Sequence, residues 1–114
     1  MFEDIFNGKN NLVVIHPGHI SYRIEERLEE PNLQELQKLV AGYIELVADK
    51  TYTAVGAYQF YTIPVQIIVN EEGRLHGMPR NTLGTQIIRY LLPEWKQMLV
   101  GPVVILAGTG VQMT

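Results

Sequence analysis

The sequence contains no cysteine, which excludes disulfide bonds, thiolate metal ligands and cysteine nucleophiles together. Serine occurs only once, at Ser21, and no serine–histidine–aspartate arrangement accompanies it. No apolar run approaches the roughly 20 residues that cross a bilayer. The acidic N-terminus also lacks the basic and apolar segments of a signal peptide. These absences predict a soluble, cytoplasmic protein without a membrane partner.

An excess of basic residues is missing as well. Nine Lys and Arg stand against twelve Asp and Glu, and the net charge is −3. Binding to phosphate backbones needs clustered Lys and Arg, so we expect no nucleic-acid partner. The chain has 114 residues, of which 46% are hydrophobic. This length and composition predict a single domain over residues 1–114, with residues 1–10 as a lead-in.

The hydrophobic pattern predicts an α+β fold, in which two short helices pack on a mostly antiparallel sheet. Asn32 and Glu35 have the spacing of a capping box, so a helix is expected after Asn32 and up to Gly42. Residues 48–62 are rich in aromatic side chains and fit either a second hairpin or an aromatic-lined loop. The expected strands are residues 12–15, 19–27, 43–47, 63–69 and 99–107, the last of them central in the sheet.

The most informative stretch is Val69–Thr85. Asn70–Gly73 has the composition of a type I hairpin turn that ends in a left-handed glycine. A short strand is expected next, and then a helix capped by Asn81. An open helix N-terminus beside Arg80 is suited to binding an anion.

Other constellations of chemically active residues are weak. His16 and His19 are separated by a Pro-Gly turn, and no third metal ligand stands at a matching spacing from them or from His76. Glu71 and Glu72 are neighbours on a turn, where their carboxylates point apart into water. We therefore predict no catalytic residue, no metal and no cofactor.

One set of residues remains as a candidate ligand site. Backbone N–H groups at a helix start and arginine side chains bind phosphate, and tyrosine rings stack on bases. The alternative interpretation is a capped helix, surface arginines and aromatic side chains that fill a small core. The candidate ligand-binding residues are Arg74, Arg80, Asn81 and Thr82 for the anion, with Tyr58 and Tyr61 for stacking.

Three segments together resemble a known family. They are LQELQKLVAGYIELV (Leu33–Val47), VNEEGRLHGMPRN (Val69–Asn81) and LVGPVVILAG (Leu99–Gly108). On these segments the chain resembles the domain-of-unknown-function family 3846, small proteins of phages and mobile elements. Its Ala41-Gly42-Tyr43 departs mildly from the glycine-glycine-tyrosine of the family, and the segment Tyr52–Tyr61 has no clear counterpart there.

The resemblance implies a phage-encoded protein that acts in the host cytoplasm by binding. We expect a non-enzymatic protein that sequesters a small nucleotide-type signal of antiviral defence. A homo-oligomer is expected, because a small domain has little concave surface of its own. The alternative is a protein–protein interaction module that inhibits or adapts a host protein. An enzyme that degrades a nucleotide with one of the histidines ranks last.

Overall fold

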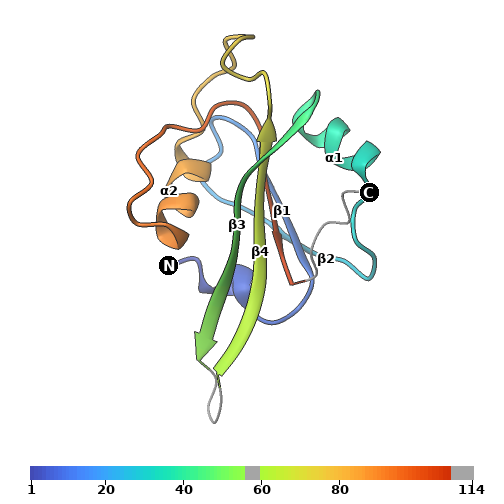
Figure 1. Ribbon diagram of the computed structural model, residues 1–114, viewed down its shortest axis with the longest axis vertical. Helices are drawn as coiled ribbons and strands as arrows, with labels where there is room; N and C mark the ends of the chain where they lie inside the picture. Colours follow the sequence, from blue (N-terminus) through green and yellow to red (C-terminus); the bar gives the residue numbers. More distant parts are fainter. Residues whose placement is uncertain (56–59, 109–114) are drawn as a thin grey trace.

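The computed structural model describes residues 1–55 and 60–108, with the backbone alone for residues 54, 55, 60 and 61. One antiparallel sheet runs through the molecule, with a long hairpin that projects at one end (Figure 1). The elements are a 3-10 helix η1 (Glu3–Phe6), β1 (Asn11–Ile15), β2 (Ile24–Glu26), α1 (Leu33–Val40), β3 (Ile44–Val55), β4 (Phe60–Asn70), α2 (Thr82–Leu91) and β5 (Val103–Ala107).

The five strands lie in the order β2-β1-β5-β4-β3, and every neighbouring pair is antiparallel. The predicted α+β class is therefore confirmed. The last strand of the chain, β5, occupies the centre of the sheet, as its continuous apolar sequence predicted. All five of its residues are buried, because β1 and β4 pair with its two edges and a helix covers each face.

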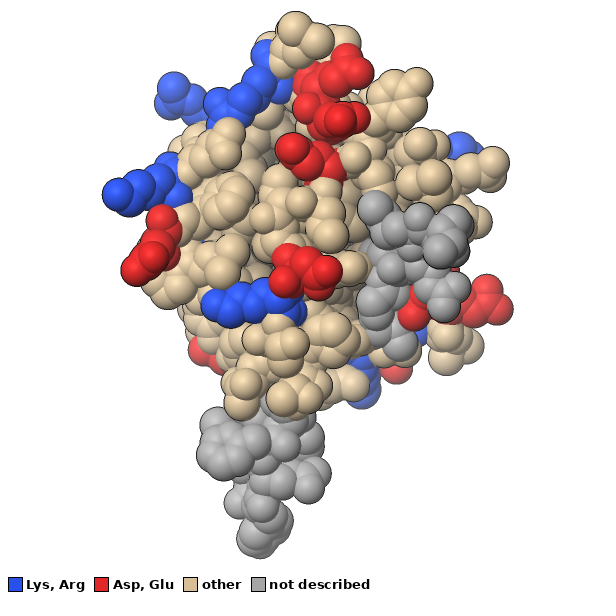
Figure 2. Space-filling view, in the orientation of Figure 1, with Lys and Arg blue, Asp and Glu red and all other residues tan. Residues whose placement is uncertain are grey.

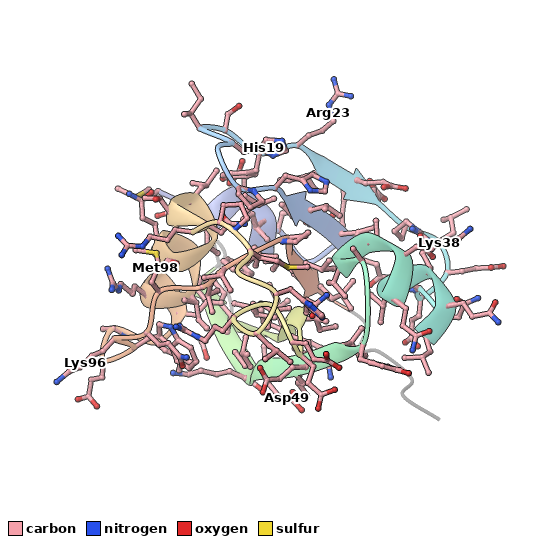
Figure 3. All side chains as sticks on the ribbon, turned by 90° about the horizontal axis from the view of Figure 1, so that it is seen from above. His19, Arg23, Lys38, Asp49, Lys96 and Met98 are labelled. Carbon is pink, nitrogen blue, oxygen red and sulfur yellow. The ribbon has the colours of Figure 1, made fainter. Side chains whose placement is uncertain are left out.

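The two helices cover opposite faces of the sheet, which Figure 3 shows from above. On one face α2 and η1 pack on a core that includes Val13, Ile67 and Ile105. On the other face α1 packs on a smaller core that includes Ile68 and Val104. Alternate residues of β4 and β5 thus enter different cores, as the strand period of two requires.

Both helices begin where the sequence predicts. The Asn32 side chain accepts a hydrogen bond from the Glu35 backbone N–H at 2.8 Å. The Glu35 carboxylate does not close a capping box, because it receives two hydrogen bonds from Arg27, at 2.6 and 2.8 Å. These bonds hold the pKa of Glu35 below its usual value. At the end of α1, Ala41 adopts the left-handed conformation and Gly42 follows it.

Of the two interpretations of residues 48–62, the hairpin is confirmed in the described part. The strands β3 and β4 pair as far as Val55 opposite Phe60. Only the part of this hairpin that is distant from its turn joins the rest of the sheet, because β5 pairs with β4 over Val65–Val69 alone.

The expected strand over residues 19–27 is mostly wrong. Strand β2 spans only Ile24–Glu26, which pair with the first three residues of β1. Ile20 is 96% exposed, and the Tyr22 hydroxyl donates to Asp4 in η1. The alternation in the sequence therefore does not correspond to a continuous ladder, because residues before Ile24 leave the edge of β1.

The expected hairpin at Asn70–Gly73 is also wrong. A turn is present there, with the Gly73 N–H donating to the Asn70 carbonyl, but further turns continue to residue 77 and Gly77 has the positive φ. The Asn70 amide donates to the Val40 and Ala41 carbonyls at the end of α1. This anchor ends β4 against α1, so the chain does not return beside β4.

Candidate functional site

A cleft of about 250 Å³ lies where β3 begins and β4 ends. Apolar side chains and backbone form much of its lining, and three charged residues reach it. In Figure 2, acidic side chains gather at the top of the visible face, and basic side chains lie to their left. The lining residues are Glu45 and Val47 from β3, Val69 and Asn70 from β4, Glu71 and Arg74 from the following turns, and Gln97, Met98, Leu99 and Val100 from the segment before β5.

Arg74 is the cationic residue of this cleft, and it is held by neutral acceptors. Its Nη2 donates to the Met98 carbonyl at 2.6 Å. With the Gln97 amide oxygen facing the guanidinium, Nε and Nη2 also donate to it at 3.0 and 2.9 Å. None of the ion pairs among the described residues involves Arg74, although Glu45 and Glu71 line the same cleft. The guanidinium is therefore positioned without being neutralised.

Asn81 plays a different part from the one the sequence suggested, because its side chain is fully engaged by the protein. Its Oδ1 accepts from the Gly84 N–H at 2.9 Å, and its Nδ2 donates to the carbonyls of Ile15 and Gly101, both at 2.8 Å. The residue is 1% exposed. The Asn81 amide thus joins the start of α2 to β1 and to the segment before β5, and it offers no free hydrogen-bonding group to a ligand.

The remaining anion-binding candidates are exposed. Arg80 forms an isolated antiparallel bridge with Val100, a residue that lines the cleft. Thr82 is the first residue of α2. Thr85, one turn further along, is buried, and its hydroxyl donates to the Asn81 carbonyl and accepts from the Leu99 N–H. The Thr85 hydroxyl thereby connects the start of α2 to Leu99, which lines the cleft.

Of the two tyrosines expected to stack on a ligand, only the backbone of Tyr61 is described, and it lies far from the arginines of its own chain. Tyr58 lies outside the described residues. Tyr61 is the second residue of β4, opposite Ala54, and its side chain is likewise not described. The nine residue steps from Tyr61 to Asn70 span about 30 Å of strand. Figure 1 shows the start of β4 and the turns after it at opposite ends of the molecule.

None of the three histidines lines this cleft. The His19 Nδ1 accepts from the His16 backbone N–H at 3.1 Å, and His76 pairs with Glu72 at 3.2 Å. His19 borders a shallow, open depression of about 490 Å³ beside β1. Within residues 1–55 and 60–108, no three histidine or carboxylate side chains gather in a way that could hold a metal ion.

Sequence reasoning did not find Glu45, Gln97 and Met98 as lining residues of the cleft. They are separated from Arg74 by about 20 residues or more in the chain, and no local motif marks them. Only the pairing of β3 with β4 and the bonds between the start of α2 and residues 98–101 bring them together.

Comparisons with known proteins give one match. The model of a family described as "Domain of unknown function (DUF3846)" matches residues 10–113. No curated protein and no solved structure matches the chain at a significant level. In the described part of the chain, no helix is long and apolar enough to cross a membrane.

Proposed function

The chain belongs to the DUF3846 family, and we propose that it is a non-enzymatic protein that binds a small anionic, nucleotide-type ligand in the Arg74 cleft. One observation carries the proposal. The Arg74 guanidinium is fixed in a cleft by a carbonyl and an amide, and its charge is not balanced by a carboxylate. An arginine held in this way is ready to bind a phosphate or a similar anion.

The geometry of Arg74 leaves one side of the guanidinium available. The recorded hydrogen bonds use Nε and Nη2, so Nη1 keeps both of its N–H donors for a ligand. Val47, Val69 and Leu99 form an apolar floor beside the Arg74 side chain, which is itself exposed and can meet an anion from solvent. Glu45 and Glu71 can accept hydrogen bonds from the amino groups of a base.

Arg80 and Thr82 lie near the Arg74 cleft and add further groups that favour an anion. Arg80 lies opposite Val100 at the border of the cleft, and Thr82 begins α2, where backbone N–H groups and the helix dipole favour negative charge. In this proposal Arg74 and Arg80 bind the anionic groups, while Asn81 holds the helix start in place.

The proposal includes a homo-oligomer. If Tyr61 stacks on the ligand, a second copy has to supply it, because Tyr61 lies about 20–30 Å of strand away from the cleft of its own chain. Ligand pockets that form between subunits are common where a single domain has little concave surface.

We also propose a biological setting. A protein of this kind, encoded by a phage or mobile element, would sequester a nucleotide-type immune signal in the host cytoplasm and so counter antiviral defence. Binding alone is sufficient for this role, because a signal that is held by a protein cannot activate its receptor.

The test is a depletion assay with a panel of cyclic dinucleotides and cyclic ADP-ribose-type signals. The protein is mixed with each compound, the free compound is measured after filtration, and the protein is then heat-denatured. We expect one compound to disappear from solution and to return intact on heating. The variant Arg74→Gln should lose most of this depletion, because it lacks the positioned charge. If no compound is depleted, or if the compound returns as a product, the proposal is wrong.

The matched control is Arg23→Gln, which removes the same charge from an exposed arginine near β2, away from the cleft (Figure 3). This variant should deplete the ligand like the wild-type protein. A general effect of net charge would instead weaken both variants equally.

One observation favours the alternative, an interaction module for a host protein. Ile20 and Leu28 stand on either side of β2 and are 96% and 97% exposed. Exposed apolar side chains of this size occur in protein interfaces. Stoichiometric recovery of one host protein on the immobilised chain, together with no depletion of any signal, would support this alternative over ligand binding.

A further inference from the structure

The sheet ends on one side in a long strand with an open edge. Strand β3 has twelve residues, and its only neighbour in the sheet of the described residues is β4. Figure 3 shows β3 along one margin of the molecule, with Asp49 pointing outward and no other helix or strand of the described residues beyond it. The opposite edge, β2, has three residues. Proteins usually keep edge strands short or covered, because unpaired backbone groups recruit further strands.

The backbone groups that face outward from β3 can be identified. Thr51 lies opposite Pro64, which has no N–H, and the Pro64 carbonyl accepts from the Gly108 N–H at 3.0 Å, on the side away from β3. Thr51 and Pro64 are therefore a pair that exchanges no hydrogen bonds. In an antiparallel ladder the N–H and C=O of such a residue point away from its partner strand. Thr51 thus presents both groups at the open edge, as do Asp49 and Thr53, two residues away on either side.

We propose that two copies of this chain pair through their β3 edges, antiparallel, about a two-fold axis at Thr51. The N–H of each Thr51 then donates to the carbonyl of the other, and the two sheets join into one of ten strands. A two-fold interface is self-complementary by construction, so a residue on the axis meets its own copy. The outward-facing groups of Asp49 and Thr53 pair with each other across the axis in the same register.

Charge selects this register over its neighbours. An axis at Asp49 or Lys50 would place two like charges directly opposite each other, which destabilises strand pairs. The axis at Thr51 instead places Asp49 opposite Thr53 of the second copy, whose hydroxyl can donate to the carboxylate. A register centred nearer the start of β3 would cross the irregularity between Leu46 and Ala48, where the ladder is broken.

The register at Tyr52 is the next one in the other direction. It would place Asp49 opposite Val55, which has no donor for the carboxylate. In the Thr51 register Lys50 faces Tyr52 of the second copy, so both charges of the strand meet polar or aromatic side chains. Asp49, Thr51 and Thr53 are exposed in the single chain, and so is Lys50, whose Nζ donates to the Leu91 carbonyl at 3.2 Å.

The dimer has a consequence for the cleft, and this consequence alone rests on the proposed function. The register places Ala54 of the second copy opposite Ala48, next to Val47, which lines the Arg74 cleft. Tyr61, which pairs with Ala54 in the hairpin, then lies about 10 Å from that part of β3, across two strand spacings. The hairpin end of one copy is thereby brought beside the cleft of the other.

The test is sedimentation of the full chain over a wide range of protein concentration. The wild-type protein should form a species of twice 13.0 kDa. The variants Thr51→Lys and Thr51→Glu should each sediment as monomers at concentrations at which the wild-type protein is a dimer, because each puts two like charges on the axis. An equimolar mixture of the two variants should restore the dimer, because opposite charges then meet there.

The matched controls are Thr62→Lys and Thr62→Glu. Thr62 is also an exposed threonine, opposite Thr53 in the same hairpin, but it belongs to β4 and so lies off the β3 edge. Both control variants should remain dimers, and circular dichroism should show that all four variants are folded. A wild-type chain that stays monomeric, a dimer that persists in both Thr51 variants, or a mixture that stays monomeric would each overturn the proposal. Ligand depletion is measured separately, so the dimer and the proposed function can fail independently.

Discussion

Asn32 and Asn81 cap the two helices in the same way but differ in their surroundings. Each accepts a hydrogen bond from the backbone N–H three residues ahead. Asn32 is exposed, so water can replace the hydrogen bond that its side chain makes. Asn81 is buried and also donates two hydrogen bonds, to the carbonyls of Ile15 and Gly101. The two asparagines therefore differ in how much stability depends on the amide nitrogen.

Replacement of each asparagine by aspartate tests this difference. Asn81→Asp keeps the acceptor for Gly84 but removes both donors and buries a charge, so it should lower the free energy of unfolding by about 3 kcal/mol or more. Asn32→Asp should change it by less than about 0.5 kcal/mol, since aspartate is as good a cap as asparagine and the helix dipole favours its charge. Urea unfolding measures both values. Equal tolerance of the two substitutions would contradict the structural role given to Asn81.

Arg74 shows the limit of residue-level reasoning. The sequence placed it in the candidate ligand set because arginine binds anions. It could not indicate that Gln97 and the Met98 carbonyl would hold the guanidinium, because those groups follow it by more than 20 residues. The residue type was predictable, and the neighbours that make it useful were not.

The next scale is the contact between elements, where α2 meets β5 with little room. A Cβ atom added at Gly84 would lie 2.7 Å from the Val103 Cγ2 and 3.0 Å from the Asn81 Oδ1. Real Cβ atoms do not approach a side-chain carbon so closely, so the absence of a side chain at Gly84 permits the helix to lie near the sheet. This close approach also holds the Asn81 cap within reach of β1.

A double-mutant cycle tests this contact. Gly84→Ala should destabilise the protein by about 1–2 kcal/mol, even though alanine favours the helix by about 1 kcal/mol, because the new methyl group overlaps Val103. Val103→Ala removes the atom that it strikes. The double variant should therefore cost about 1 kcal/mol less than the sum of the two single changes, as measured by urea unfolding. Additive effects would show that Gly84 and Val103 do not constrain each other.

At the scale of the whole molecule, the order of the strands makes folding depend on the end of the chain. Strand β5 joins β1 to β4, so within the described residues the two parts of the sheet meet only through residues 103–107. Both cores also include residues of β5. In the described structure β1 and β4 do not pair with each other, so β5 is the connection between them.

A chain that ends at residue 100 should therefore have no cooperative unfolding transition. Its apolar residues on β1 and β4 would remain exposed, because each of these strands would lack one neighbour and part of its core. Thermal unfolding followed by near-ultraviolet circular dichroism measures this, and a peptide of residues 101–108 added in excess should restore part of the signal. A cooperative transition in the shortened chain alone would contradict this account.

The local elements were largely determined by the sequence. Helix α1, its cap at Asn32, the cap of α2 at Asn81 and the apolar strand β5 all follow from short-range patterns, in which the interacting groups lie within one or two turns of each other. The failed expectations depended on distant partners. The alternating residues before Ile24 do not pair with β1. The turn at Asn70 depends on hydrogen bonds to the end of α1, about 30 residues earlier in the chain.

Only the tertiary structure decided the cleft, because its walls come from three separate parts of the chain. It also decided that Asn81 supports the fold and that Tyr61 stands far from Arg74. The reason is physical: a residue's chemistry is carried by its own side chain, whereas burial, charge balance and the direction of backbone groups are set by whatever packs beside it. The open edge at Thr51 was also decided by the tertiary structure, because the sequence of a strand does not show which of its two edges will pair with another strand.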